Sequence, residues 1–402
     1  MSAITAYRAL LRIVGPAYVV VAFLGRIPLA MSQIGVLLLV SQATGQYALG
    51  GAAAGVLAVA NAIGAPISGG LADRFGQRPV VVVQSLAGAL GLVAVVIATE
   101  LDSPVGVVVA ATAAGLALPQ IGPLARVRWR PITADSTDQR GLVNAAFSYE
   151  GAADEASFVL GPALIGVLAI VLDPAGAVLA GAALLAVFGT WFGIHPTARL
   201  VSGHDGRGAE PVVWWTSAFA ILVVAQMCIG MLFGSVQTGT ASLTEAAGVP
   251  GAAGLIHAVL GIGSVTAGLA MAALPERIRY ASRMLVAAGA MLVLSAPLLL
   301  VDSIGALVFV IAVLGFAVAP YMISNFALAG VIVPIPRVGT AMTLLAGATG
   351  LGYAIGAAIA GRLADIDGHT AAFGVTVAAT VVAVVVAATA QGTLRRAPVV
   401  NG

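Results

Sequence analysis

Four ionisable side chains lie inside long apolar runs of this 402-residue chain: Arg26, Glu150, Asp154 and Glu155. The chain as a whole is 60% hydrophobic and only 8% charged. A charge in the middle of a lipid-embedded helix costs about 2.5 to 3.5 kcal/mol even on the lenient insertion scale, so such groups normally face a cavity or one another. Neighbouring charges shift the pKa of a carboxyl group kept there, so that it can bind and release a proton. The four residues therefore indicate proton coupling.

Spacing on a helix divides these residues further. Glu150 and Asp154 are four positions apart and share one face, whereas Glu155 points about 100° away. At about 1.5 Å per residue, Arg26 and Asp154 both lie near mid-membrane in their segments. If Arg26 neutralises one carboxylate, the other can carry a proton. The alternative is a static bridge from Arg26 to Asp154 that holds two helices together, with the second acid merely solvated.

The segments that must position these groups are hydrophobic along the whole chain. Mean hydropathy is +1.07, and a charged fraction of about 25% would be typical of a soluble domain. Each segment is long enough to cross a hydrocarbon core of about 30 Å as a helix, and none alternates as a β-barrel strand would. We expect an all-α membrane protein with twelve transmembrane helices, at 15–41, 48–68, 79–99, 104–125, 142–172, 175–194, 214–240, 251–274, 284–301, 304–333, 338–361 and 370–391.

The basic residues indicate how the chain crosses the membrane. All eighteen are arginine, and the positive-inside rule then places both termini in the cytoplasm. This topology puts Arg126, Arg128, Arg130 and Arg283 in inner loops and leaves only Arg362 outside. We expect a multi-pass protein of the cell (plasma) membrane.

A polar stretch, "HPTARLVSGHDGRGAEP" at 195–211, separates two halves of similar length. We expect an N-terminal six-helix bundle at 1–195, a cytoplasmic linker at 196–213 and a C-terminal six-helix bundle at 214–402. Transporters built from two such repeats hold their substrate between the halves near the midplane.

The loop after the second segment reads "GGLADRFGQRP". Together with the twelve segments and the central linker, it resembles the major facilitator superfamily over essentially the whole chain. The family signature G-x-L-a-D-r-x-G-r-r/k is matched by Gly69, Leu71, Asp73, Arg74, Gly76 and Arg78. We expect Gly69 to allow close helix packing, Gly76 to form a tight turn and Asp73 to pair with arginines. The resemblance implies a latch between the halves on the inner face; alternatively, the loop only determines topology and folding.

A second motif is a partial match. Gly161, Pro162 and Gly166 in "SFVLGPALIG" resemble the signature g-x-x-x-G-P-x-x-G-G of proton-driven drug exporters, but Ser157 and Ile165 stand where two glycines belong. Such residues bend a helix and allow close packing, which would hinder leakage. A simple kink is the alternative.

A third family feature is missing at its expected place. Exporters often carry R-x-x-Q-x-x-G in the fourth helix, and here Gln120 matches but Ala117 falls where the arginine would be. The usual proton-relay arginine is therefore not predicted, and Arg26 is left as the candidate to replace it.

Polar residues within other segments are candidates for the substrate path: Gln33, Gln226, Gln237, Tyr321 and Asn325. The alternative for each is a hydrogen bond between helices, which is the commoner role of such side chains in membranes. We expect His257 to be a packing histidine.

These observations predict a secondary active transporter, with proton-coupled efflux of a small amphipathic or lipophilic molecule by alternating access. A phosphorylated substrate is disfavoured because only Arg26 could meet an anion inside. The alternatives are a uniporter or proton symporter for a sugar-like metabolite, or a membrane sensor or assembly partner that does not transport. With no lysine there is no nucleotide-binding P-loop. We expect no enzyme activity, cofactor or metal, and a monomer whose partners are substrate, protons and membrane lipid, not nucleic acid.

Overall fold

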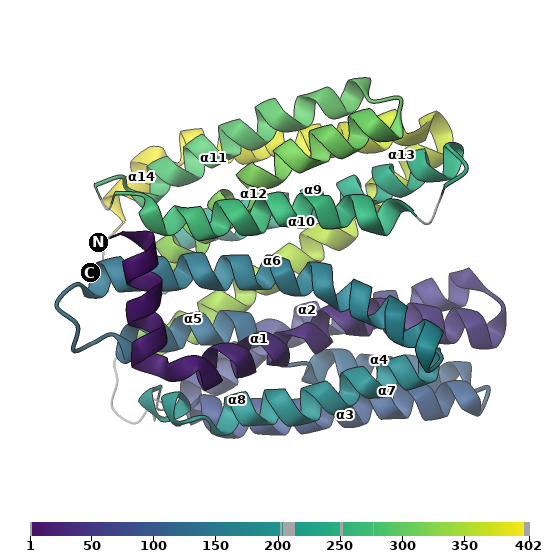
Figure 1. Cartoon of the computed structure of the whole chain (residues 1–402), viewed down its shortest axis with the longest axis horizontal. Coiled ribbons are helices and arrows are strands. Elements are labelled where there is room, and N and C mark those ends of the chain that lie inside the picture. The colour runs from purple at the N-terminus through teal and green to yellow at the C-terminus, as the bar shows by residue number, and fades with distance from the viewer. Residues whose placement is uncertain (1, 202, 204–213, 250–251, 276, 398–402) are drawn as a thin grey trace.

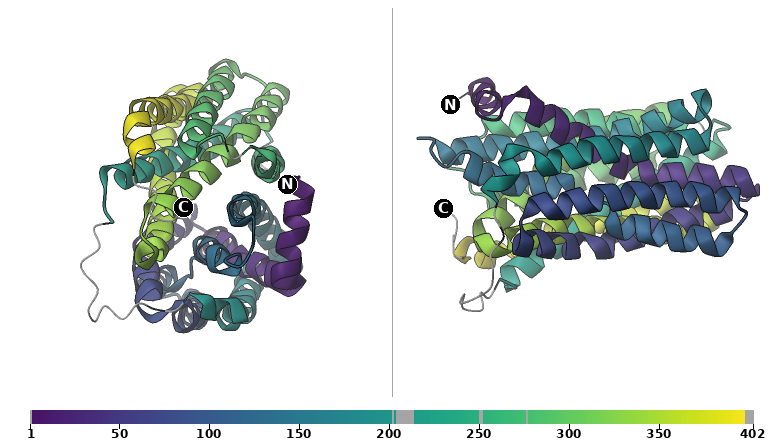
Figure 2. Two further views of the ribbon diagram at one scale, coloured as in Figure 1. Left: turned by 90° about the vertical axis from the view of Figure 1, so that its left-hand side faces the viewer. Right: turned by 90° about the horizontal axis from the view of Figure 1, so that it is seen from below.

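A computed structural model describes residues 2–201, 203, 214–249, 252–275 and 277–397. Long helices lie side by side over nearly all of these residues (Figures 1 and 2). Most of the predicted linker at 196–213 lies outside the described residues.

The first half of the chain contains eight α-helices. Their bounds are α1 Ala3–Thr44, α2 Tyr47–Phe75, α3 Gln77–Glu100, α4 Pro104–Ala117, α5 Ile121–Ile132, α6 Gln139–Val171, α7 Pro174–Leu184 and α8 Thr190–Ile194, with a π-helical turn η1 at Leu185–Gly189 and a 3-10 turn η2 at Pro196–Leu200.

The second half has fewer but longer helices. They are α9 Ser217–Ala246, α10 Ala252–Ala270, α11 Tyr280–Ser295, α12 Ile304–Ile332, α13 Val338–Thr389 and α14 Gln391–Arg396, with 3-10 turns η3 Met271–Ala273, η4 Ala296–Leu300 and η5 Ile335–Arg337.

Within the described part, eleven helical stretches are long and apolar enough to cross a membrane. The last, Ile335–Thr389, has 55 residues and covers one predicted segment, 338–361, and all but the last two residues of the next, 370–391. They are joined at a kink where Asp367 and Gly368 leave the helical conformation and Gly368 has φ 74°. The prediction of an all-helical, multi-pass membrane fold is confirmed.

The fourth predicted segment differs from the structure. It is broken at Leu118–Gln120 and then continues as α5 to Ile132, beyond its predicted end at 125. Asn61 on α2 holds the break: its Nδ2 donates to the carbonyl oxygens of Gly115 at 3.2 Å and Leu118 at 3.4 Å. Gln120 Nε2 donates to Asn61 Oδ1 at 3.1 Å. Side-chain groups thus satisfy backbone carbonyls that the broken helix leaves unpaired.

Both termini lie at the same end of the molecule, on the left in Figure 1. The α2–α3 turn and the starts of α6, α11 and α13 are at this end too. We call it the arginine-rich end, because exposed Arg8, Arg12, Arg74, Arg78, Arg140, Arg279 and Arg396 lie on these segments.

The two halves contact each other through α2 with α13, α6 with α10 and α12, and α5 with α13. Large apolar side chains cover the outside, among them Ile170, 87% exposed, and Leu300, 85% exposed. Such side chains suit a surface that faces lipid rather than water.

Candidate functional site

The buried charges predicted to interact do meet. Arg26 on α1 places its Nη2 2.6 Å from Glu150 Oε2 and its Nη1 3.0 Å from Asp154 Oδ1, both on α6. Arg26 and Glu150 are buried, and the Asp154 side chain is 17% exposed. One arginine therefore joins both acids of the shared helix face, where the sequence predicted contact with one of them.

A second arginine, predicted to lie in a loop, completes the site. Arg126 on α5 is buried and places its Nη1 2.7 Å from Asp154 Oδ2. Its guanidinium also lies 4.3 Å from the ring centre of Phe326 on α12, in the other half. Trp129 Nε1 donates to Glu150 Oε1 at 2.7 Å. Two arginines and two carboxylates thus form one balanced network.

The first turn of α5 adds to the positive surroundings of Asp154. A Cβ at Gly122 would collide with the Asp154 carboxylate, so this glycine lets the carboxylate approach the helix start closely. The N-terminal end of a helix carries about half a positive charge and stabilises a nearby anion.

Glu155 is separate from this network. It is buried and forms no ion pair among the described residues. Its carboxyl group lies beside Ser264 on α10, in the other half. The spacing predicts that Glu155 points away from the face that Glu150 and Asp154 share. The Glu155 carboxyl group accordingly faces the boundary between the halves and has no ion-pair partner among the described residues.

Arg128 is also buried rather than in a loop, which corrects the predicted topology of this stretch. Its Nε donates to Gln77 Oε1 at 2.7 Å, and its Nη1 donates to the Phe192 carbonyl and to Thr197 Oγ1, each at 3.0 Å. It stacks on the Phe192 ring at 3.6 Å. Burial and the nearby Arg128 charge lower the pKa of His195. Arg128 joins α5 to α3 and to the end of the first half.

The family-type loop forms a contact between the halves, but with partners other than the predicted arginines. Asp73 Oδ1 accepts a hydrogen bond from Gly339 N at 2.9 Å, and Oδ2 accepts from Thr340 N at 2.7 Å and Thr340 Oγ1 at 2.6 Å. These donors are at the start of α13. Asp73 therefore caps a helix of the opposite half, where a carboxylate meets unpaired N–H groups and the positive helix end.

The glycines of this loop have the predicted roles. A Cβ on Gly69 would lie 2.5 Å from the Gly339 carbonyl oxygen, so α2 and α13 touch backbone to backbone. Gly76 has φ 84°, a conformation that glycine adopts without strain. Leu71, Arg74 and Arg78 are exposed at this end.

A second buried contact joins the halves nearby. Arg283 at the start of α11 donates from Nη1 to Asn144 Oδ1 on α6 at 2.8 Å. Arg283, predicted to lie in an inner loop, is buried in the structure. Arg283 lies at the arginine-rich end, in agreement with the prediction that it is on the same side of the membrane as most other arginines.

The antiporter-like residues lie in the second half of α6, as predicted. A Cβ on Gly161 would lie 2.6 Å from Ala30 Cβ on α1, so Gly161 allows close packing. Nothing lies within 4 Å of the corresponding point at Gly166, so close packing there is not observed. Pro162 is inside α6, and Figure 1 shows this helix bending in its second half.

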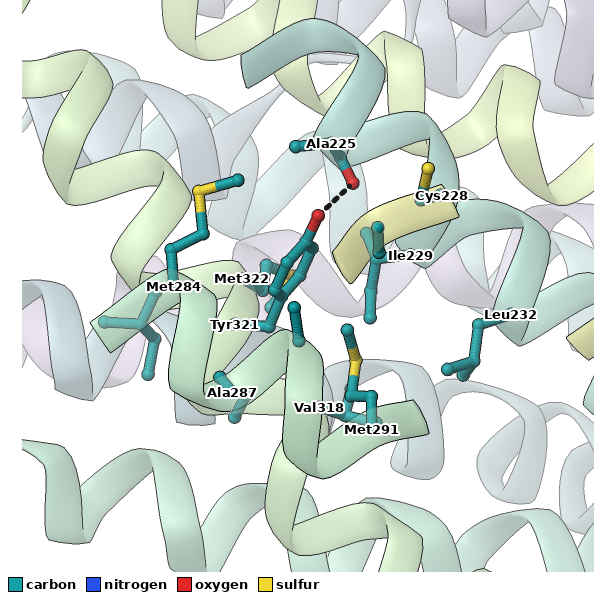
Figure 3. Close-up of a cluster of buried hydrophobic side chains, with 14 of the residues drawn as sticks. Ala225, Cys228, Ile229, Leu232, Met284, Ala287, Met291, Val318, Tyr321 and Met322 are labelled. Atoms are coloured by element: carbon teal, nitrogen blue, oxygen red, sulfur yellow. Dashed lines mark hydrogen bonds between the residues drawn. The ribbon is translucent and has the colours of Figure 1, made fainter. Parts of the chain in front are cut away.

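Most of the substrate-path candidates form hydrogen bonds between helices of the second half. Tyr321 Oη donates to the Ala225 carbonyl at 3.1 Å (Figure 3). Asn325 Nδ2 donates to Gln226 Oε1 at 2.7 Å, and Tyr353 Oη donates to Gln237 Oε1.

These bonds match the packing alternative, and substrate contact by these residues stays a prediction. Gln33 is half-buried. His257 Nδ1 has no hydrogen-bond partner in the part of the chain that the structure describes.

The described residues contain no cluster of three or more side chains that could hold a metal ion.

Two helical halves that meet around buried charges define a class of protein: a membrane transporter that carries its substrate between two bundles. The sequence matches the family model of the Major Facilitator Superfamily over residues 14–305 and 222–400. The chain belongs to this superfamily, and it is a transporter rather than an enzyme.

Solved structures with this fold come from transporters of different substrates. The human organic anion transporter MFSD10 (TETRAN) has a TM-score of 0.69 at 19% identity, over 94% of this chain and 99% of that one. A bacterial homologue of the iron transporter ferroportin, in an outward-facing state, has a TM-score of 0.71 at 14% identity, over 94% and 98%. A mutant of the nucleoside transporter NupG has a TM-score of 0.57 at 17% identity, over 94% and 99%. No curated protein matches in sequence.

Proposed function

We propose that this protein is a proton-coupled exporter of a small amphipathic molecule, with the arginine-rich end in the cytoplasm and with Glu155 as the proton carrier. The observation that carries the proposal is the contrast between Glu155, buried without a cation, and the balanced network of Arg26, Arg126, Glu150 and Asp154. A buried carboxyl without a counter-ion is most stable as the neutral acid.

The place of Glu155 supports coupling to a conformational change. Its neighbour Ser264 belongs to the other half, so separation of α6 from α10 would admit water to the carboxyl. Water stabilises the charged form and permits release of the proton. Proton binding would then favour the state in which the two helices are packed, and proton loss the state in which they are apart.

Arg126 extends the range of substrates to be tested. Arg26 is the only residue predicted to meet an anion inside, and Arg126 is a second buried guanidinium in the site. A substrate carboxylate that replaced Asp154 on Arg126 would form a charge-assisted bond of the same kind. The organic anion transporter MFSD10 shares this fold at 19% identity, which supports including organic anions with lipophilic cations in a screen.

The test is proton movement in proteoliposomes loaded with a pH-sensitive dye. A panel of organic anions and lipophilic cations is first screened for compounds that cause proton flux through the wild-type protein. Glu155→Gln is expected to abolish substrate-driven proton flux while retaining exchange of labelled for unlabelled substrate. Glu245→Gln, which changes an exposed glutamate on α9, is the matched control.

The alternatives give different results. A uniporter would move the substrate without protons, and a symporter would accumulate it on the same side as the protons. A sensor or assembly partner would exchange no substrate in any variant. Proton flux that survives Glu155→Gln would refute Glu155 as the proton carrier. Flux that also survives Glu150→Gln and Asp154→Asn would refute proton coupling through these acids.

A further inference from the structure

The first turns of α1 form a separate helix that does not cross the membrane. The helix is interrupted at Gly15, which has φ 76° and ψ 162°. Residues 3–14 run across the end of the bundle in Figure 1, whereas the rest of α1 lies along the other helices. Twelve residues span only about 18 Å as a helix, too short for a hydrocarbon core of about 30 Å. We refer to residues 3–14 as the surface helix.

The surface helix is attached to both halves of the protein. Tyr7 Oη donates to the carbonyl oxygen of Leu269 on α10 at 2.8 Å. Ala6 and Leu10 are buried in a cluster with core residues of the first half, and Ala272 of the second half packs against the same cluster. The surface helix therefore has a definite position across the junction of the halves.

The opposite side of the surface helix carries charge that nothing in the described structure balances. Arg8 and Arg12 are four positions apart, share a face and are exposed. Neither forms an ion pair among the described residues, and the sequence contains no acidic residue before Asp73. Beside the arginines lie two exposed apolar side chains, Ile4, 66% exposed, and Leu11, 45% exposed.

We propose that this face binds the headgroups of anionic phospholipids. A short helix with arginines next to exposed aliphatic side chains lies in the membrane interface, where the apolar groups enter the acyl boundary and the arginines reach the phosphates. The helix is at the end of the protein where the membrane surface must lie, and its free charge is positive only. An anionic lipid satisfies both features, because its phosphate meets the arginines and its acyl chains meet Ile4 and Leu11.

The experiment measures which lipids neighbour the surface helix. Because Cys228 is the only cysteine, a Cys228→Ser background with Thr5→Cys accepts one fluorophore at an exposed position of the surface helix. The protein is reconstituted in phosphatidylcholine vesicles containing a small, equal fraction of nitroxide-labelled phosphatidylglycerol or nitroxide-labelled phosphatidylcholine. The ratio of quenching by the two labelled lipids reports enrichment of the anionic headgroup.

Quenching by labelled phosphatidylglycerol is expected to exceed quenching by labelled phosphatidylcholine severalfold, and this ratio should fall at high salt. Each arginine near an anionic surface contributes at most roughly a fivefold preference, which sets an upper limit of about 25-fold for the two. Arg8→Gln with Arg12→Gln should therefore bring the ratio close to one. Arg8→Lys with Arg12→Lys keeps both charges and should keep most of the enrichment.

A control separates this site from a general effect of surface charge. Arg140→Gln with Arg199→Gln removes the same charge from exposed positions outside the surface helix and should leave the ratio unchanged. A ratio of one in the wild-type protein, a ratio unaffected by the Arg8 and Arg12 changes, or an equal loss in the control would each overturn the proposal. The measurement needs no transported substrate, so its outcome is independent of the proposed function.

Discussion

Asp73→Asn is expected to weaken the contact between the halves at the arginine-rich end. The carboxylate accepts three hydrogen bonds, at 2.9, 2.7 and 2.6 Å, from the start of α13. Hydrogen bonds to a charged group contribute about 1.5 to 3 kcal/mol each and neutral ones about 1. Asparagine keeps one acceptor oxygen and turns an amide N–H₂ towards donors. We expect a loss of about 2 to 4 kcal/mol, which shifts the equilibrium between closed and open states roughly 30- to 1,000-fold.

The assay is an electron-spin distance measurement across this end. Spin labels at Thr137→Cys before α6 and Arg279→Cys before α11, in the Cys228→Ser background, report the separation of the halves. The wild-type protein should give one short distance, and Asp73→Asn should add a longer one while membrane insertion stays normal. Asp135→Asn, which changes an exposed acid at the same end, should have no effect. An unchanged distance distribution would refute the latch, and failure to insert would favour the alternative role in topology and folding.

Three further changes test other contacts. Gly69→Ala introduces a Cβ 2.5 Å from the Gly339 carbonyl oxygen, so the same spin labels should again show a longer distance; an unchanged distance would mean that the backbones separate easily. Arg128→Ala removes three hydrogen bonds and a ring contact, and it should lower the free energy of unfolding by about 3 kcal/mol or more. Tryptophan fluorescence should show a lower unfolding temperature, and an unchanged temperature would contradict this packing role. Asn61→Leu removes the donor to two backbone carbonyls at the α4–α5 break and should destabilise the protein by about 1 to 3 kcal/mol, whereas a stable variant would show that water satisfies these groups.

The sequence predicted the helices and the main site residues because both depend on the cost of polar groups in lipid. Long apolar runs have one spanning solution, and a charge inside them needs a partner. Arg26, Glu150 and Asp154 were found from burial cost alone. Their spacing also separated Glu155 from the other two acids, and the structure places its carboxyl beside the opposite half.

The predictions about Arg126, Arg128 and Arg283 were wrong for one physical reason. Hydropathy places arginines at the ends of membrane segments, both for Arg283 and for the three arginines in five residues at 126–130. Buried arginines are nevertheless tolerated where carboxylates, carbonyls and aromatic rings surround them. The alternation in "ARVRWR" was the available signal, because it continues the apolar pattern between the charges. The partners that make burial possible, Asp154, Phe192 and Asn144, are distant in sequence.

The partner of Asp73 was also beyond the sequence. Arginines adjacent in the motif are the obvious neighbours of a carboxylate, yet backbone N–H groups at the start of α13 are 266 and 267 positions away. Backbone donors are the same at every residue and leave no mark in the sequence. Only the fold brings this helix start to the loop.

The approach of α13 to α2 at two places has a mechanical consequence. Besides Gly339 at the arginine-rich end, Gly347 lies so close to α2 that a Cβ there would be 2.9 Å from the Ala62 carbonyl oxygen. Gly347 is about 12 Å along the helix from Gly339 and about 30 Å from the kink at Asp367. If α13 tilts as a rigid rod about Gly347, the end at Asp367 moves about two and a half times as far as the end at Gly339. A separation of α13 from α2 by a few ångströms at one membrane surface therefore displaces α13 by about a side chain's length at the other.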